Sequence, residues 1–228
     1  MKTISAVLHG IRFKNALTML AIAFTSTMWH APVRAQDFTT DNAWKTQQTP
    51  AGRMVWQHVG RVYLNPANGQ FIYAGYLVHI DGIDTPLFNG SPSESSAYFT
   101  FSTGPLVAQL TPLPDNGDVH LAVVSAGTFS VYYNATPSGD WSNPASFSSG
   151  KLVATFERKE SLFAEIGPVS FHNLSETLKS SHSFTFDGQT YNFGRIAPHG
   201  ITFSQFCSNA TLACAGAVWA VGEPSDRR

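Results

Sequence analysis

The sequence contains few charged residues. Only 13% of its 228 residues are Asp, Glu, Lys or Arg, about half of the ~25% that is usual in soluble domains. The 14 basic residues nearly balance the 15 acidic ones, so the chain lacks the basic character typical of nucleic-acid-binding domains. Low charge does not imply disorder here, because 43% of the residues are hydrophobic and 13% are aromatic. We therefore expect a packed domain with no nucleic-acid partner.

The sequence also lacks an apolar run long enough to cross a bilayer as a helix. The stretch over residues 16–29 is 14 residues long, whereas a transmembrane helix needs roughly 20. It follows three basic residues and precedes Val33-Arg34-Ala35, which offers small residues at the positions that a signal peptidase recognises. We predict a signal peptide over residues 1–35, a single all-β domain over 36–228, and a secreted or periplasmic protein with no membrane span after cleavage.

Cleavage would also change the charge of the chain. Four of the 14 basic residues and none of the 15 acidic ones lie in residues 1–35, which leaves ten basic residues against 15 acidic and a formal charge of −5. A mildly acidic chain has no electrostatic attraction to nucleic acid or to an anionic membrane surface.

Cysteine is scarce, with only Cys207 and Cys214 in the chain. In an oxidising compartment two such residues are expected to form a disulfide. Their separation is wider than the Cys-x-x-Cys spacing of redox motifs, and two cysteines alone do not make a zinc site. We predict a structural disulfide.

Motifs for common catalytic and cofactor chemistry are missing. The sequence contains no Gly-x-Ser-x-Gly elbow, no glycine-rich phosphate loop, no dinucleotide fingerprint and no His-Glu-x-x-His. The stretch Asp115-Asn116-Gly117-Asp118 resembles a calcium loop, but no Glu closes it at the required offset, and the same residues favour a tight turn. We expect no cofactor and no metal ion.

Apolar residues instead recur at every second position, as in Phe129, Val131 and Tyr133, which is typical of strands. Pairs such as Asn68-Gly69 and Asp187-Gly188 predict hairpin turns between such runs. We predict an all-β fold, an antiparallel β-barrel or a barrel-like sandwich of about nine to eleven strands. At most one short helix is expected, at Ser161–Ile166 or Leu174–Lys179.

Two strands differ in their predicted burial. The run Gln70–Asp81 is apolar on both faces, which predicts a strand covered on both sides. Strict alternation gives one face Phe71, Tyr73, Leu77 and His79, and the other Ile72, Tyr76, Val78 and Ile80. The run Ala97–Ser102 alternates apolar and polar residues, which predicts one packed face and one wet face.

His79 and Asp81 are the weak catalytic candidates. Two residues apart on a strand, they would share a face and could act together as acid and base, with Tyr76 or Tyr98 nearby. This pattern favours a small barrel enzyme, a hydrolase, cyclase or isomerase, as one alternative. The other interpretation is that the strand simply ends at Asp81-Gly82, because no nucleophile or third group accompanies the pair.

The abundance of aromatic residues is compatible with either a packed core or an apolar interior that holds a ligand. The candidate ligand-binding residues are Tyr73, Tyr76, Tyr98 and Trp141. Our leading hypothesis is a non-catalytic secreted or periplasmic barrel that binds a small hydrophobic ligand or a protein partner. An envelope or extracellular structural protein is the remaining alternative.

Overall fold

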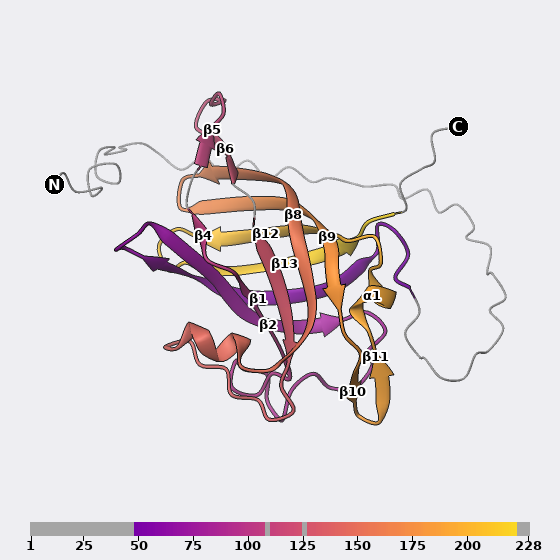
Figure 1. Ribbon diagram of the computed structural model, residues 1–228. Helices are drawn as coiled ribbons and strands as arrows, with labels where there is room; N and C mark the ends of the chain where they lie inside the picture. The colour runs from indigo at the N-terminus through magenta and orange to yellow at the C-terminus, as the bar shows by residue number, and fades with distance from the viewer. Residues whose placement is uncertain (1–47, 108–109, 125–126, 223–228) are drawn as a thin grey trace, which may run out of the picture. The chain divides into compact units, whose positions relative to one another are not determined.

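The computed structural model describes residues 48–107, 110–124 and 127–222, so the predicted signal peptide lies outside the described residues. Eight strands form a closed antiparallel barrel in the order β8-β7-β3-β2-β1-β13-β12-β9, and β9 pairs back with β8 (Figure 1). The strands of this ring are β1 (Met54–Asn65), β2 (Gln70–Ile80), β3 (Phe99–Thr103), β7 (Thr128–Tyr133), β8 (Lys151–Ile166), β9 (Val169–Ser181), β12 (Ile201–Ser208) and β13 (Ala213–Ala220). The predicted all-β antiparallel fold is confirmed, and it is a barrel.

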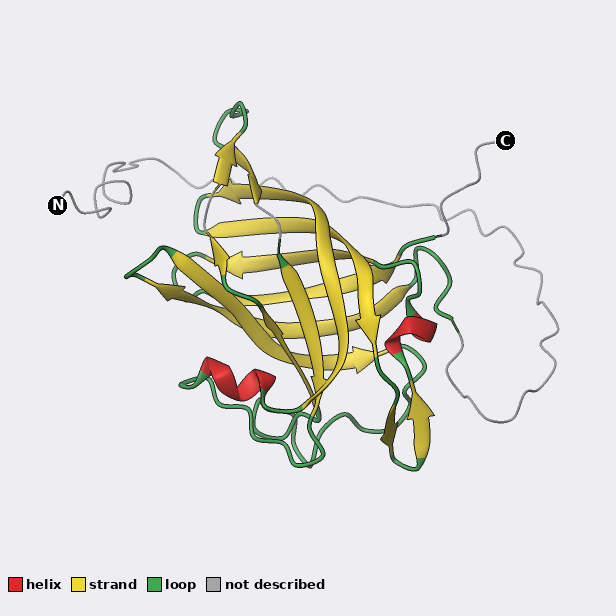
Figure 2. Ribbon diagram, in the orientation of Figure 1, coloured by secondary structure: helices red, strands yellow, loops and turns green. Residues whose placement is uncertain are grey.

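Shorter elements decorate the ring. Strand β4 pairs with β2, and the β5–β6 hairpin extends from β8, which brings the sheet to 11 strands. Strands β10 and β11 form a separate two-stranded sheet. The bounds of these elements are β4 (Leu106–Val107), β5 (Leu110–Pro112), β6 (His120–Val124), β10 (Phe184–Phe186), β11 (Gln189–Tyr191), the 3-10 helix η2 (Pro144–Ser148) and the helix α1 (Phe193–Ile196). Helix α1 lies at one end of the ring, and the β1–β2 and β5–β6 hairpins lie at the other (Figure 2).

Both predicted helix positions are wrong. Ser161–Ile166 lies in β8 and Leu174–Lys179 lies in β9, the two longest strands, with 16 and 13 residues. These strands pair from Ala154 opposite Ser181 to Ile166 opposite Val169. The long ladder of hydrogen bonds, interrupted only by two register shifts, outweighs the helical preference of the Glu, Leu and Lys residues in these segments.

The two predicted hairpin turns are confirmed. Gly69 has a φ of 68° in the β1–β2 turn, and Asp187 and Gly188 have φ values of 47° and 72° between β10 and β11. At Asp187-Gly188, positive φ at both central residues is the conformation that lets a two-residue turn match the twist of its strands.

Strand β2 contains a bulge that overturns part of the predicted alternation. Trp56 pairs with Ile80, but His58 pairs with Leu77, so β2 carries one extra residue in this interval. Leu77 and Ile80 are therefore both buried, whereas His79 is exposed. The prediction that His79 shares a face with Leu77 is wrong, because a bulge reverses the alternation beyond it.

Strand β3 is buried on both faces, which corrects the prediction of one wet face. The segment containing η2 covers its outer side. The Thr100 hydroxyl donates a 2.7 Å hydrogen bond to the carbonyl oxygen of Phe147, and the Asn134 amide donates to the Thr100 hydroxyl at 2.9 Å. Phe147 itself is fully buried. Thr100 of β3 thus faces an outer layer of protein and not water.

An aromatic cluster packs the interior around Trp56. Its ring lies 6.1 Å from that of Phe129, 5.6 Å from that of Phe156 and 5.7 Å from that of Phe193, which belongs to α1. All four side chains are buried. Because aromatic side chains bury large apolar areas, this cluster supplies much of the stability of the barrel.

Candidate functional site

The barrel encloses a cavity of about 230 Å³. Its walls are mainly apolar, with side chains that include Val62, Phe71, Phe129, Leu174 and Phe203. Leu64, which also lines the cavity, is 59% exposed, whereas Glu176 on the same cavity is only 2% exposed. The cavity therefore runs from an exposed rim into the barrel interior.

Two glycines shape the interior next to this cavity. A Cβ at Gly60 would lie 2.7 Å from the ring of Tyr73, and a Cβ at Gly216 would lie 2.8 Å from Cε1 of His58. Both distances are closer than side chains tolerate. Glycine at these positions therefore lets the rings of Tyr73 and His58 lie against the neighbouring strands.

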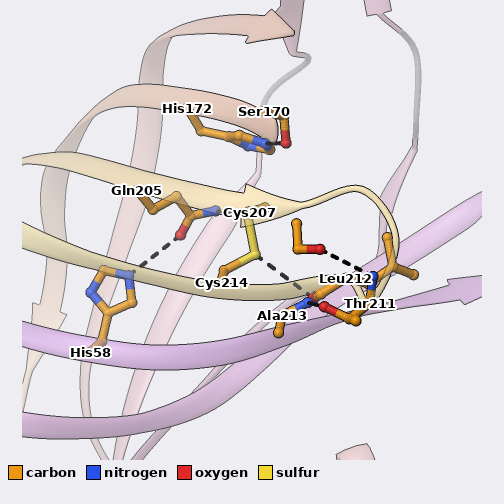
Figure 3. Close-up of a disulfide and its surroundings, with 10 residues drawn as sticks. His58, Ser170, His172, Gln205, Cys207, Thr211, Leu212, Ala213 and Cys214 are labelled. Atoms are coloured by element: carbon orange, nitrogen blue, oxygen red, sulfur yellow. Dashed lines mark hydrogen bonds between the residues drawn. A yellow bond between two sulfur atoms is a disulfide. The ribbon is translucent and has the colours of Figure 1, made fainter. Parts of the chain in front are cut away.

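A row of polar side chains crosses the interior. His58 of β1 pairs with Gly216 of β13, and Gly216 pairs on its other side with Gln205 of β12. Gln205 then pairs with His172 of β9. Figure 3 shows Gln205 and His58 reaching toward each other, with Oε1 of Gln205 3.4 Å from Nε2 of His58. With Nε2 donating to this oxygen, Nδ1 of His58 is left as an acceptor, and it has no hydrogen-bond partner among the described residues.

Both histidines of this row are held neutral. Burial lowers the pKa of His58 to about 3, and the hydrogen bond with Gln205 opposes this shift. Burial, assisted by the charge of Arg158, lowers the pKa of His172 to about 4. Nε2 of His172 is 3.2 Å from the Ser170 hydroxyl (Figure 3). Neutral imidazoles at pH 7 can donate or accept hydrogen bonds, but they add no charge to the cavity.

A charged pair also contributes to the cavity wall. Arg158 of β8 and Glu176 of β9 are register partners, with Nε of Arg158 3.7 Å from Oε1 of Glu176 and side-chain exposures of 6% and 1%. Neither carboxylate oxygen of Glu176 accepts a hydrogen bond from the part of the chain that the structure describes. Burial raises the pKa of Glu176 to about 7, although the Arg158 charge opposes the shift. The carboxylate is thus free to accept hydrogen bonds from a molecule in the cavity.

The disulfide lies at the rim of the cavity. Cys207 and Cys214 are opposite each other on β12 and β13 and are joined, with a Cα–Cα distance of 4.1 Å. Cys207 and Leu212 both line the cavity, so the bridge fixes the turn that borders its opening (Figure 3). The predicted disulfide is confirmed, and it fits an extracellular or periplasmic location.

Of the four predicted ligand-binding residues, only Tyr73 lines the cavity. Its buried hydroxyl has no hydrogen-bond partner in the described ranges, and burial raises its pKa. The other three contact different groups: the rings of Tyr76 and Trp141 lie 5.8 Å from each other, and that of Tyr98 lies 5.2 Å from Phe186. These three do not line the cavity.

The predicted catalytic pair is also separate from the cavity. His79 is exposed on β2, and the Asp81 carboxylate accepts a 2.8 Å hydrogen bond from the Thr49 hydroxyl. The backbone N–H of Asp81 donates to the carbonyl oxygen of Val55 at 2.7 Å. These two hydrogen bonds hold Asp81 at the end of β2.

Sequence reasoning missed Arg158, His172, Glu176 and Gln205. The signal that could have indicated Glu176 is its spacing: it shares the inner face of β9 with Leu174 and His172, at intervals of two. A charged residue that continues an otherwise inward-facing series is uncommon and marks a candidate site.

Comparison of this chain with protein-family models, curated proteins and solved structures finds no match. The class of the protein therefore rests on its own architecture, a closed eight-stranded antiparallel barrel with an interior cavity. In the described ranges, no three His, Cys, Asp or Glu side chains are grouped as a metal site. No helix in that part of the chain is long and apolar enough to cross a membrane.

Proposed function

We propose that this protein binds a small, mainly apolar molecule inside its barrel. The observation that carries the proposal is the cavity of about 230 Å³, with apolar walls and a few buried polar groups. A cavity of ~150 Å³ holds the six carbons of benzene, so by proportion this one accommodates about nine non-hydrogen atoms. Eight-stranded barrels of this size have room for one small ligand.

The apolar walls supply the driving force for binding. Transferring an eight-carbon chain from water to the cavity contributes about 6 kcal/mol, at ~0.8 kcal/mol per CH₂. Association costs several kcal/mol in lost translation and rotation. The apolar contacts are thus sufficient for weak binding, and the buried polar groups provide the selectivity.

Calorimetric titration with 1-octanol, whose nine non-hydrogen atoms match the cavity, tests the proposal. Leu174→Trp fills the cavity and is expected to abolish binding, because Leu174 is buried and lines it. Leu162→Trp is the matched control on the outer face of β8, where Leu162 is 38% exposed. Both variants are checked for retained β structure by circular dichroism. Equal binding by both variants and the unmodified protein would place octanol on the surface and contradict the proposal.

One observation favours a second function, proton transfer to or from a bound molecule. Glu176 has a pKa near 7 through burial and faces an apolar cavity, which is the environment of an effective general base. The probe 1,2-benzisoxazole, whose nine non-hydrogen atoms match the cavity and whose ring opens when a base removes its ring proton, tests this function. Ring opening that is lost in Glu176→Gln would support proton transfer by Glu176. A rate of ring opening equal to that with free acetate would exclude this function.

We further propose that the protein is exported through a signal peptide over residues 1–35. The disulfide supports export, because such bonds persist in oxidising compartments. N-terminal sequencing of the protein recovered from outside the cytoplasm should begin at Gln36. Recovery of the intact chain in the cytoplasm with reduced cysteines would contradict this proposal.

A further inference from the structure

We infer that the molecule in the cavity presents an uncharged hydroxyl group to Glu176, so that the ligand class is a small aliphatic alcohol. This inference rests on the proposed binding function and specifies its ligand. Glu176 is 2% exposed and lines the cavity. Its two carboxylate oxygens accept no hydrogen bond from the residues described.

An ionised carboxylate can only accept hydrogen bonds. A ligand group that satisfies Glu176 must therefore be a donor. Leaving a buried charged acceptor without hydrogen bonds is costly, so a donor in this position gains more than an ordinary surface hydrogen bond would. This requirement already disfavours ethers and hydrocarbons as the preferred ligands.

The neighbouring arginine determines the charge of the donor. Nε of Arg158 is 3.7 Å from Oε1 of Glu176, so the two side chains together are close to neutral. An ammonium group at Glu176 would lie beside the guanidinium of Arg158, and a carboxylate near Arg158 would lie beside Glu176. Either arrangement places like charges together at low dielectric. A neutral hydroxyl avoids both.

The remaining walls accommodate the hydrocarbon part of such a ligand. From Glu176 the cavity passes Leu174 and Phe203. It reaches the exposed rim at Leu64, which is 59% exposed. A chain of this kind would have its hydroxyl at the buried end and its alkyl tail directed toward the opening.

Two isomers form the main test: 1-octanol and heptyl methyl ether have the same atoms, but only the alcohol donates a hydrogen bond. Calorimetry at pH 8, above the pKa of Glu176, is expected to show octanol binding about tenfold more tightly or better. Octanoate and octylammonium complete the panel, and each is expected to bind more weakly than octanol.

Variants assign the preference to Glu176. Glu176→Gln keeps the side-chain volume, and its amide N–H₂ can donate to an ether oxygen, so the alcohol-to-ether ratio should fall close to one. Glu160→Gln, at an exposed position on β8, is the matched control and should keep the full ratio. Thermal unfolding verifies that both variants are folded.

The outcomes separate this inference from the proposed function. Equal affinity for octanol and the ether overturns the inference but leaves apolar ligand binding intact. Tightest binding of octanoate would show that Arg158 recognises an anion, and tightest binding of octylammonium would show that Glu176 recognises a cation; each overturns the inference. If none of the four binds, the proposed binding function itself fails.

Discussion

Three titratable groups of the interior, His58, His172 and Glu176, predict an unusual dependence of stability on pH. Burial lowers the pKa of His58 to about 3 and that of His172 to about 4, both from 6.5, and it raises the pKa of Glu176 from 4.5 to about 7. Unfolding exposes all three groups and returns them to ordinary values. The histidines therefore destabilise the folded protein in acid, and Glu176 destabilises it toward neutral pH.

The net slope follows from counting protons. Between pH 4.5 and 6.5, the two histidines are protonated in the unfolded chain but neutral in the folded protein. Glu176 is the opposite case, because it is protonated in the folded protein and ionised in the unfolded chain. Unfolding thus takes up a net of one proton, so the free energy of unfolding should rise by about 1.4 kcal/mol per pH unit in this window. Between pH 6.5 and about 7 only the Glu176 contribution remains, and it lowers stability as the pH rises. Maximum stability is expected near pH 6.5.

Glu176→Gln removes the opposing contribution. In this variant both histidines act unopposed, and the slope below pH 6.5 should double to about 2.7 kcal/mol per pH unit. The fall in stability above pH 6.5 should disappear. In the wild-type protein, the ionisation of Glu176 lowers the free energy of unfolding by about 3 kcal/mol between pH 4.5 and 7, because its pKa is raised from 4.5 to about 7. The variant should lose none of it.

Urea unfolding with the disulfide intact, between about pH 5 and 8, measures these slopes. The wild-type protein, Glu176→Gln and the exposed control Glu160→Gln are compared. Plots of the free energy of unfolding against pH should be parallel for the wild-type protein and Glu160→Gln. The plot for Glu176→Gln should be steeper below pH 6.5 and flat above it. If all three curves are parallel, Glu176 does not titrate as a buried carboxyl and the reasoning is refuted.

Three further changes test other parts of the structure. Replacing Cys207 and Cys214 together by Ala should lower the free energy of unfolding by about 2.5 kcal/mol, from the entropy of closing the eight-residue loop; no loss on denaturant unfolding would show that the bridge is dispensable. Gly60→Ala should lower the free energy of unfolding by about 1–3 kcal/mol in the same assay, because its Cβ would lie 2.7 Å from the Tyr73 ring and 2.8 Å from the carbonyl oxygen of Ala74. An unchanged midpoint would contradict this close packing. His79→Ala should change stability by less than about 0.5 kcal/mol and leave octanol binding intact, since the side chain is exposed; lost binding would restore His79 as a site residue.

The class of fold was predictable because it depends on local patterns. Alternation with a period of two is the direct consequence of strand geometry. In the predicted turn pairs, Gly69, Asp187 and Gly188 have the positive φ that their residue types favour. The helix predictions failed where segments with good helix formers lie in β8 and β9. There the decisive interactions are with a partner strand, and local preference does not reveal them.

The site was far less predictable. Tyr73 lines the cavity, whereas Tyr76 and Trp141 belong to an aromatic cluster away from it. Some of its polar groups come from strands that are distant in the sequence, as in the pairing of His58 with Gln205, 147 positions apart. Only the closure of the barrel brings such residues together, and sequence spacing carries no information about it.

The charged pair depends on one irregularity in β8. The register of β8 against β9 shifts between Arg158 and Glu160, so Lys159 is the extra residue of a bulge. Phe156 and Arg158 are buried before the bulge, whereas Phe163 lines the cavity after it. Strict alternation from Phe156 would direct Leu162 inward, yet Leu162 is 38% exposed. The bulge therefore lets one strand present Arg158 to Glu176 and an aromatic ring to the rim of the same cavity. Bulges that redirect side chains are common beside functional sites, and this one supports the view that the buried pair serves binding, since burying it costs stability that an apolar pair would not.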